Sequence, residues 1–176
     1  SSVMRIVEAS ADSDWWFVPP SFGRTDHEGY YKNPTPAEMR GLMHMAMAHG
    51  ADGMMLWCLQ SWGRWPALIE QQSLKPCDGK LTAVGEAAAL IAKHAELLAT
   101  LRYGYFEVRN SNPIRVEVVP RRSEAGRPYA YVINRDSAAP ATTTLTYRGA
   151  AGSSAARDLF SGRVLDTDFG QAGLRS

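Results

Sequence analysis

Two unbroken apolar runs stand in the first half of the chain, Trp15-Trp16-Phe17-Val18 and Met54-Met55-Leu56-Trp57-Cys58-Leu59. Neither run alternates with polar residues, which is typical of strands covered on both faces, as in parallel sheets. A fragment of a buried helix would give the same pattern for the first run. The aromatic and β-branched residues of that run, and the prolines Pro19 and Pro20 that end it, favour a strand.

The segment between the two runs predicts a helix. Thr35 suits the N-cap, Pro36 suits the first helical position, and Glu38 completes a capping box with Thr35. Gly50 supplies a left-handed stop, and the apolar face between them is formed by Met39, Leu42, Met43, Ala46 and Met47. Strand, helix and strand together indicate a βαβ unit, whose two strands are parallel.

A second helix is expected over residues 82–101, with one apolar face formed by Val84, Ala88, Ile91, Ala95, Leu98 and Leu101. From residue 102 the hydrophobic period changes to two, as in 114–118 and 129–133, with turn residues between the runs. This pattern predicts short antiparallel strands of a β-sandwich-type domain. The expected fold class is therefore α/β over residues 1–101 followed by all-β over residues 102–176.

Composition supports a boundary between these halves. All five tryptophans lie before residue 66, and all lysines lie at or before Lys93. Residues 1–101 hold eight basic and eleven acidic side chains, whereas residues 102–176 hold eleven basic and seven acidic ones. The chain opens with serines and ends soon after the run at 158–165, so we expect a piece truncated at both ends.

The whole-chain composition excludes several classes of protein. A chain of 176 residues with 45% hydrophobic residues and a net charge of +1 is not disordered in its main state, and its charge does not fit a nucleic-acid binder. No apolar run approaches the ~20 residues that cross a bilayer. Cys58 and Cys77 are too few for a disulfide scaffold. A secreted or periplasmic location is favoured over a cytoplasmic one, and the oligomeric state stays open.

Aromatic and polar residues that could bind a ligand follow both apolar runs. Ligands bind outside the carboxyl ends of parallel strands, and the 19–33 connection is long for a βα loop of ~2–6 residues. Aromatic faces suit the C–H side of a pyranose, and polar side chains suit its hydroxyl groups. We therefore expect a carbohydrate partner held by Phe22, Trp57, Gln60 and Trp62, whereas Trp15 and Trp16 are expected in the core.

Catalytic residues are less clearly marked. Asp26 and Glu28 are the candidate acid/base pair, and the alternative is an ion-pair cluster with the neighbouring basic residues. Glycoside hydrolysis needs two carboxyl groups ~5–10 Å apart across the bond, which neighbours in one loop rarely span. His44 and His49 do not share a helix face closely, so no metal site is expected, and no motif indicates a cofactor.

Several stretches together resemble the end of a known enzyme family. They are Trp16–Gly23, Pro34–Arg40 and Ala48–Trp57, followed by Tyr129–Asn134 and Asp158–Gly162. The chain resembles the last two βα units of bacterial TIM-barrel glycoside hydrolases of the β-galactosidase-like group, which carry β-sandwich domains after the barrel. The resemblance implies that residues 13–19 form barrel strand seven, that residues 53–59 form strand eight, and that the protein cleaves an oligo- or polysaccharide. Many such barrels end strand seven with a nucleophilic Glu, a position that here reads Val18-Pro19-Pro20-Ser21-Phe22.

Two functional hypotheses follow from these observations. The first is a glycoside hydrolase in which this segment supplies the substrate-binding rim. The alternative is a non-catalytic carbohydrate-binding or scaffolding protein without the carboxylate pair, which the missing Glu after Val18 favours. An α/β enzyme of another chemistry at the same rim is a third interpretation.

Overall fold

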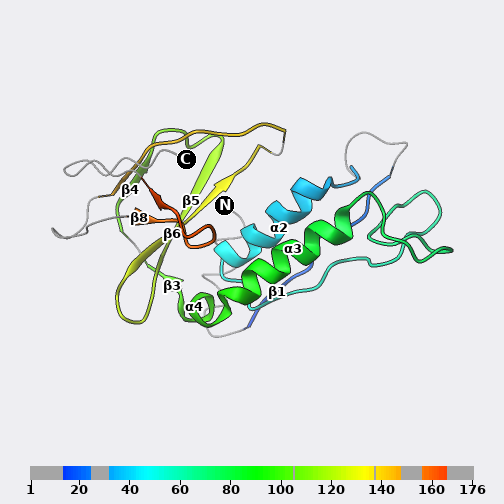
Figure 1. Cartoon of the computed structure of the whole chain (residues 1–176), viewed down its shortest axis with the longest axis horizontal. Helices are drawn as coiled ribbons and strands as arrows, with labels where there is room; N and C mark the ends of the chain where they lie inside the picture. The colour runs from blue at the N-terminus through cyan, green and yellow to red at the C-terminus, as the bar shows by residue number, and fades with distance from the viewer. Residues whose placement is uncertain (1–13, 25–31, 105, 137, 148–155, 166–176) are drawn as a thin grey trace. The chain divides into compact units, whose positions relative to one another are not determined.

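The computed structural model describes residues 14–24, 32–104, 106–136, 138–147 and 156–165 (Figure 1). The chain divides into two compact units, Ser1–Ala95 and Glu96–Ser176. The first unit contains β1 (Trp16–Phe17), α2 (Pro36–Ala48), β2 (Gly53–Met54) and α3 (Lys80–Lys93), and α4 (Ala95–Thr100) begins at the boundary. The second contains β3 (Arg102–Tyr103), β4 (Val108–Asn110), β5 (Val116–Arg122), β6 (Pro128–Asn134), β7 (Leu145–Tyr147), β8 (Ala156–Arg157) and β9 (Val164–Leu165).

Strands β1 and β2 pair in parallel, with Trp16 opposite Gly53 and Phe17 opposite Met54. The predicted parallel arrangement of the two apolar runs is therefore confirmed. Each strand nevertheless has only two residues, and a proline explains why. The Met55 amide donates to Phe17 O at 3.0 Å, but the return bond to Met55 O would have to come from residue 19, which is a proline without an N–H. The ladder resumes beyond it, where Trp57 N donates to Pro19 O at 3.1 Å.

The expectation that both faces of this pair are covered is wrong. Exposure alternates along both runs, and one face leaves Trp16, Val18, Met55, Trp57 and Leu59 between 45% and 64% exposed. Phe17 and Leu56 lie on the other, more covered face. Trp16 was expected in the core and is 64% exposed, because the described part of the chain places no layer over its face.

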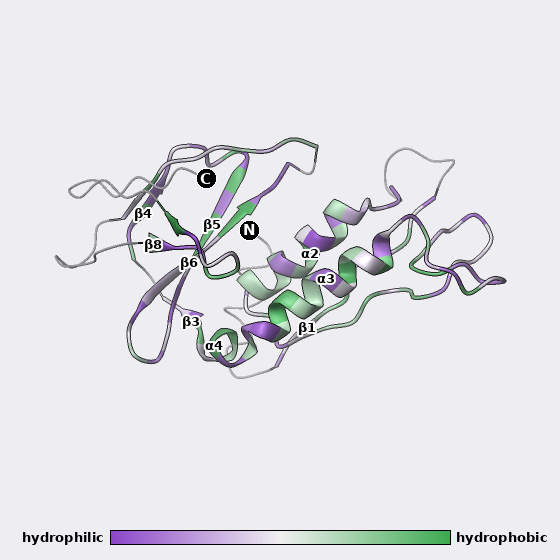
Figure 2. Cartoon of the chain, in the orientation of Figure 1, coloured by the Kyte–Doolittle hydropathy of each residue, from purple (hydrophilic) through white to green (hydrophobic). Residues whose placement is uncertain are grey.

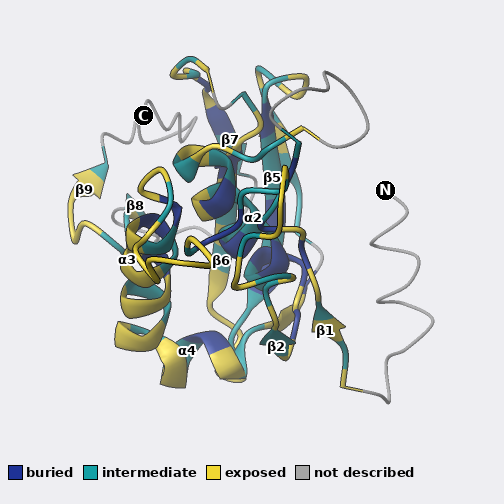
Figure 3. Ribbon diagram, turned by 90° about the vertical axis from the view of Figure 1, so that its right-hand side faces the viewer, coloured by how far each residue is buried: buried dark blue, intermediate teal, exposed yellow. Residues whose placement is uncertain are grey.

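Helix α2 begins as predicted, since the capping box between Thr35 and Glu38 is present. Burial of Met39, Met43 and Ala46 matches part of the predicted apolar face, and Ala48 is buried as well. The expected helix over 82–101 is instead two helices, because α3 ends at a C-cap on His94 before α4 begins. The buried residues of α3 are Lys80, Ala83 and Ala87, none of which belongs to the predicted apolar face. In α4 the predicted face residue Leu98 is buried. Figure 2 shows hydrophobic and hydrophilic residues side by side along both long helices, and Figure 3 shows exposed residues along α3.

The second unit is built from small antiparallel sheets. Strand β5 pairs with β3 and β6, β4 pairs with β7, and β8 pairs with β9. Val116, Val119, Ile133 and Leu145 form its buried apolar centre. Burial alternates along β6, which is the period-two pattern of its sequence.

These strands correct the expected fold class. The described residues contain one parallel pair and no closed barrel, and the antiparallel strands form three separate sheets in place of a β-sandwich. The TIM-barrel prediction is therefore wrong for this structure. That prediction came from the resemblance to TIM-barrel glycoside hydrolases. A barrel strand is covered on both faces, whereas the pair here leaves one face exposed and its ladder is interrupted at Pro19. Among the helices that the structure describes, none is both long enough and apolar enough to span a membrane.

Candidate functional site

The segment after β2 forms a loop that is closed at its base by Ser61. The Ser61 amide donates to Ile69 O at 2.8 Å, and the Ser61 hydroxyl donates to the same oxygen at 2.7 Å. That hydroxyl also accepts from the Ala67 amide at 2.9 Å. The side chain of one serine thus holds the two ends of the 61–69 segment together, which fixes the position of the tryptophans within it.

Trp62 and Trp65 face each other across a tight turn inside this segment. Each donates its backbone N–H to the carbonyl oxygen of the other, at 3.1 and 2.9 Å. Gly63 occupies the first central position with φ +54°, as the two-residue hairpin turns of type I′ and II′ require. The turn holds the indole of Trp62 in solvent, where it is 75% exposed.

An open depression of about 270 Å³ lies at this turn and is lined by Arg24, Trp62, Gly63, Arg64 and Trp65. This volume is just below the usual range of small-molecule sites, about 300–1,000 Å³. Its lining combines two indoles with two guanidinium groups. Because an arginine carries five N–H donors, each guanidinium can hold a neighbouring protein group and still donate to a ligand oxygen.

The loop after β1 contributes a third aromatic side chain, Phe22, next to these two indoles. The rings of Phe22 and Trp65 lie 5.5 Å apart between centroids, at an interplanar angle of 64°. The guanidinium carbon of Arg24 lies 5.6 Å from the centroid of Trp65, within the range of a cation–π contact. The structure therefore brings Phe22 and Trp62, two of the predicted site residues, to one end of the parallel pair through Trp65.

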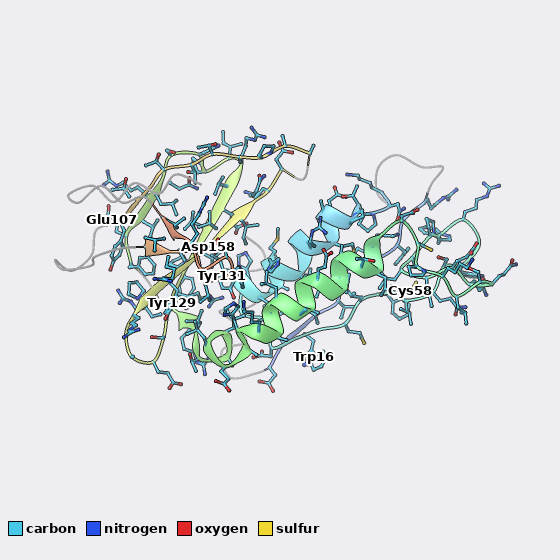
Figure 4. All side chains as sticks on the ribbon, viewed as in Figure 1. Trp16, Cys58, Glu107, Tyr129, Tyr131 and Asp158 are labelled. Carbon is cyan, nitrogen blue, oxygen red and sulfur yellow. The ribbon has the colours of Figure 1, made fainter. Side chains whose placement is uncertain are left out.

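Trp57 and Gln60 lie on the segment that leads into the loop. Trp57 is 60% exposed, bridges to Pro20 and is joined to Cys58 by a cis peptide bond. The side-chain amide of Gln60 donates to Gln71 O at 3.3 Å, so this predicted sugar-binding group is engaged in holding the loop. Figure 4 shows Trp16 and Cys58 toward opposite ends of the two parallel apolar runs.

Neither candidate catalytic carboxylate can be placed, because Asp26 and Glu28 lie outside the described residues. No carboxylate lines the depression in the part of the chain that the structure describes. Glu70, on the same loop, forms a short hydrogen bond with the Ser73 hydroxyl. Within the described ranges no group of His, Cys, Asp and Glu side chains could hold a metal ion.

Lys80 is the residue near the site that sequence reasoning missed. It is fully buried at the start of α3, and its ammonium group donates to Asn33 Oδ1 at 2.8 Å. Burial lowers the pKa of Lys80 from its usual 10.5. A lysine in a polar stretch is normally exposed, so the sequence offers no signal that would single it out.

No protein-family model matches the chain, and no curated protein matches it significantly.

Proposed function

We propose that the chain binds carbohydrate at the depression formed by the Trp62–Trp65 turn, with the sugar ring stacked on the indole of Trp62. The observation that carries this proposal is that Trp62 is 75% exposed although its backbone is held by two reciprocal hydrogen bonds with Trp65. A ligand that covers this indole removes apolar surface from water, and a turn backbone that is fixed before binding lowers the entropic cost of ordering the loop.

The groups around Trp62 fit the two sides of a sugar. A pyranose has an apolar C–H face, which an indole can cover, and a rim of hydroxyl groups that need hydrogen-bond partners. Arg24 and Arg64 line the depression and carry donors for such oxygens. The depression takes one ring or the end of a longer chain, because its volume is only about 270 Å³.

Binding without cleavage is the function that these residues support best. Hydrolysis of a glycosidic bond needs a pair of carboxyl groups across it, and the described lining of the depression contains none. Glycoside hydrolysis by Asp26 and Glu28 stays a prediction from the sequence. Release of the aryl group from a panel of aryl glycosides by the chain would establish catalysis and replace the binding-only proposal.

Titration calorimetry with hexasaccharides of β-1,4-linked glucose, xylose, mannose and galactose tests the proposal. We expect at least one of them to bind, and Trp62→Ala to weaken that binding at least tenfold. Trp16→Ala is the matched control, because Trp16 is also exposed, at 64%, but pairs with Gly53 at the other end of the ladder. Equal losses in the two variants, or no binding by the unaltered chain, would contradict the proposal.

A further inference from the structure

A buried cation joins the backbone segments that hold the proposed site. The Lys80 ammonium group lies within hydrogen-bonding distance of three acceptors, Asn33 Oδ1 at 2.8 Å, Pro66 O at 3.3 Å and Ser21 O at 3.4 Å. These acceptors come from three stretches of chain, one after β1, one before α2 and one after β2. An ammonium group has three N–H donors, which matches this number of acceptors.

The position of this lysine is unfavourable for the helix that carries it. Lys80 is the first residue of α3, where the helix dipole disfavours a positive charge, and its N-cap Gly79 offers no side-chain cap. Removing an ammonium group from water is also costly unless its donors are satisfied. These costs are offset by the three hydrogen bonds and by the nearby carboxylate of Asp78. Because all three bonds go to the loops, the ammonium group stabilises the loops more than it stabilises the helix.

Two of the three acceptors adjoin the aromatic residues of the site. Ser21 precedes Phe22, and Pro66 follows Trp65, so the same ammonium group holds both backbones of the Phe22–Trp65 pair. Ser21 continues the connection, because its amide donates to Trp57 O at 2.6 Å and its hydroxyl donates to Cys58 O at 2.5 Å.

We infer that Lys80 is the positioning residue of this site: its ammonium group holds the loops after β1 and β2 at the spacing that presents Trp62 and Trp65 to a ligand. Trp65 transmits this constraint to Trp62 through their reciprocal backbone hydrogen bonds. The part of this inference that concerns affinity rests on the proposed carbohydrate binding, and the part that concerns loop order does not.

Hydrogen exchange of the full chain tests loop order without any ligand. In Lys80→Met we expect the amides of Trp62, Trp65 and Ser21 to exchange at least tenfold faster, with the α2 amides unchanged. Lys93→Met is the matched control, because Lys93 is the exposed last residue of the same helix. Uniform acceleration over both the loops and α2, or no acceleration in the loops, would overturn the inference.

Titration with the hexasaccharide that binds the unaltered chain most tightly tests the affinity part. Lys80→Met is expected to raise its Kd at least tenfold and Lys93→Met to leave it unchanged. If Lys80→Met does not fold, Asn33→Leu decides, since it removes the acceptor at 2.8 Å and should accelerate the same loop amides. If the unaltered chain binds no sugar, the proposed function fails, and the exchange result alone decides the role of Lys80.

Discussion

The indole of Trp16 lies directly over the backbone of Gly53, so close that a Cβ on Gly53 would stand 2.6 Å from two of its ring carbons. The two residues are paired in the parallel ladder of β1 and β2. A glycine at the first position of β2 therefore makes room for a large ring on the exposed face of the neighbouring strand. This explains why the short pair tolerates an indole there.

We predict that Gly53→Ala displaces the Trp16 indole and lowers the free energy of unfolding by about 1 kcal/mol, the lower end for overpacking. The cost is small because the ring is 64% exposed and can swing into solvent. Gly23→Ala should cost more, about 3 kcal/mol, since the new Cβ would meet the backbone of Asn33 at 2.1 Å, and backbone cannot move aside as a side chain can.

Urea unfolding measures both changes, and Gly41→Ala is the control. A Cβ on Gly41 meets nothing within 4 Å, and the residue lies inside α2. Its replacement should therefore stabilise the protein by about 0.5–1 kcal/mol. If Gly23→Ala were no more destabilising than Gly53→Ala, the close approach of Gly23 to Asn33 would be refuted.

Glu38 makes stability depend on acid pH. Burial works to raise its pKa, but hydrogen bonds from Lys32 and from the backbone and hydroxyl of Thr35 outweigh it and lower the pKa from 4.5 to about 2. The folded state therefore favours the carboxylate more than the unfolded state does. Its contribution is complete above pH 4.5 and is lost as the pH falls toward 2.

In Glu38→Gln we expect the loss of stability between pH 4.5 and pH 2 to become shallower, and stability at pH 7 to fall by about 1 kcal/mol through the damaged cap. Chemical denaturation at several pH values measures both effects. Glu86→Gln is the control, because its exposed carboxylate contacts the exposed Arg40 at 3.1 Å, a pair worth about 0–1 kcal/mol. Parallel pH profiles for the unaltered chain and Glu38→Gln would count against this account.

The sequence predicts what is local and misses what depends on distant neighbours. The capping box of α2 follows from Thr35, Pro36 and Glu38 alone, and it is present. Parallel pairing of the two apolar runs follows from the helix between them. Whether a second layer covers their outer face is not encoded in the runs, since Trp16 and Trp57 would suit either a core or an exposed surface.

The candidate site shows the same division. Phe22 and Trp62 were predicted to share one end of the parallel pair, and Trp65 joins them there. The prediction that Gln60 contacts a ligand stays a prediction. Its amide donates to Gln71 O, a contact that depends on how the loop closes and that the sequence does not show. The sequence does not predict the role of Lys80, because its three acceptors come from segments that only the folded chain brings together.

His44 should make the stability of the protein depend on pH in the mildly acidic range. Burial lowers the pKa of this imidazole below 6.5, so the unfolded state takes up the proton more readily than the folded state. Stability should therefore fall as the pH drops below about 6.5 and level off below the folded-state pKa. In His44→Gln this step should disappear, as measured by thermal unfolding between pH 7.5 and 5. If the variant lost stability over the same pH range, the loss would have to come from another titratable group.

In the second unit, Asn110 uses both ends of its side-chain amide. Its Nδ2 donates to Val116 O at 2.6 Å, and its Oδ1 accepts from the Asn112 amide at 2.9 Å and from the Thr143 hydroxyl. Asn110→Asp would place a carboxylate oxygen against the carbonyl of Val116. The loss of that donor, with a charge in a half-buried site, should cost about 2 kcal/mol at pH 7.

Asn134→Asp is the matched control for this change, because Asn134 makes a similar pair of contacts, with Ala139 O at 2.8 Å and the Asp136 amide at 3.0 Å, but is exposed. Water can solvate the new carboxylate there, so the cost should stay within about 0.5 kcal/mol, as for most surface substitutions. Urea unfolding of both variants at pH 7 gives the comparison. Equal costs would mean that Asn110 does not bridge β4, β5 and the segment before β7 as its three contacts indicate.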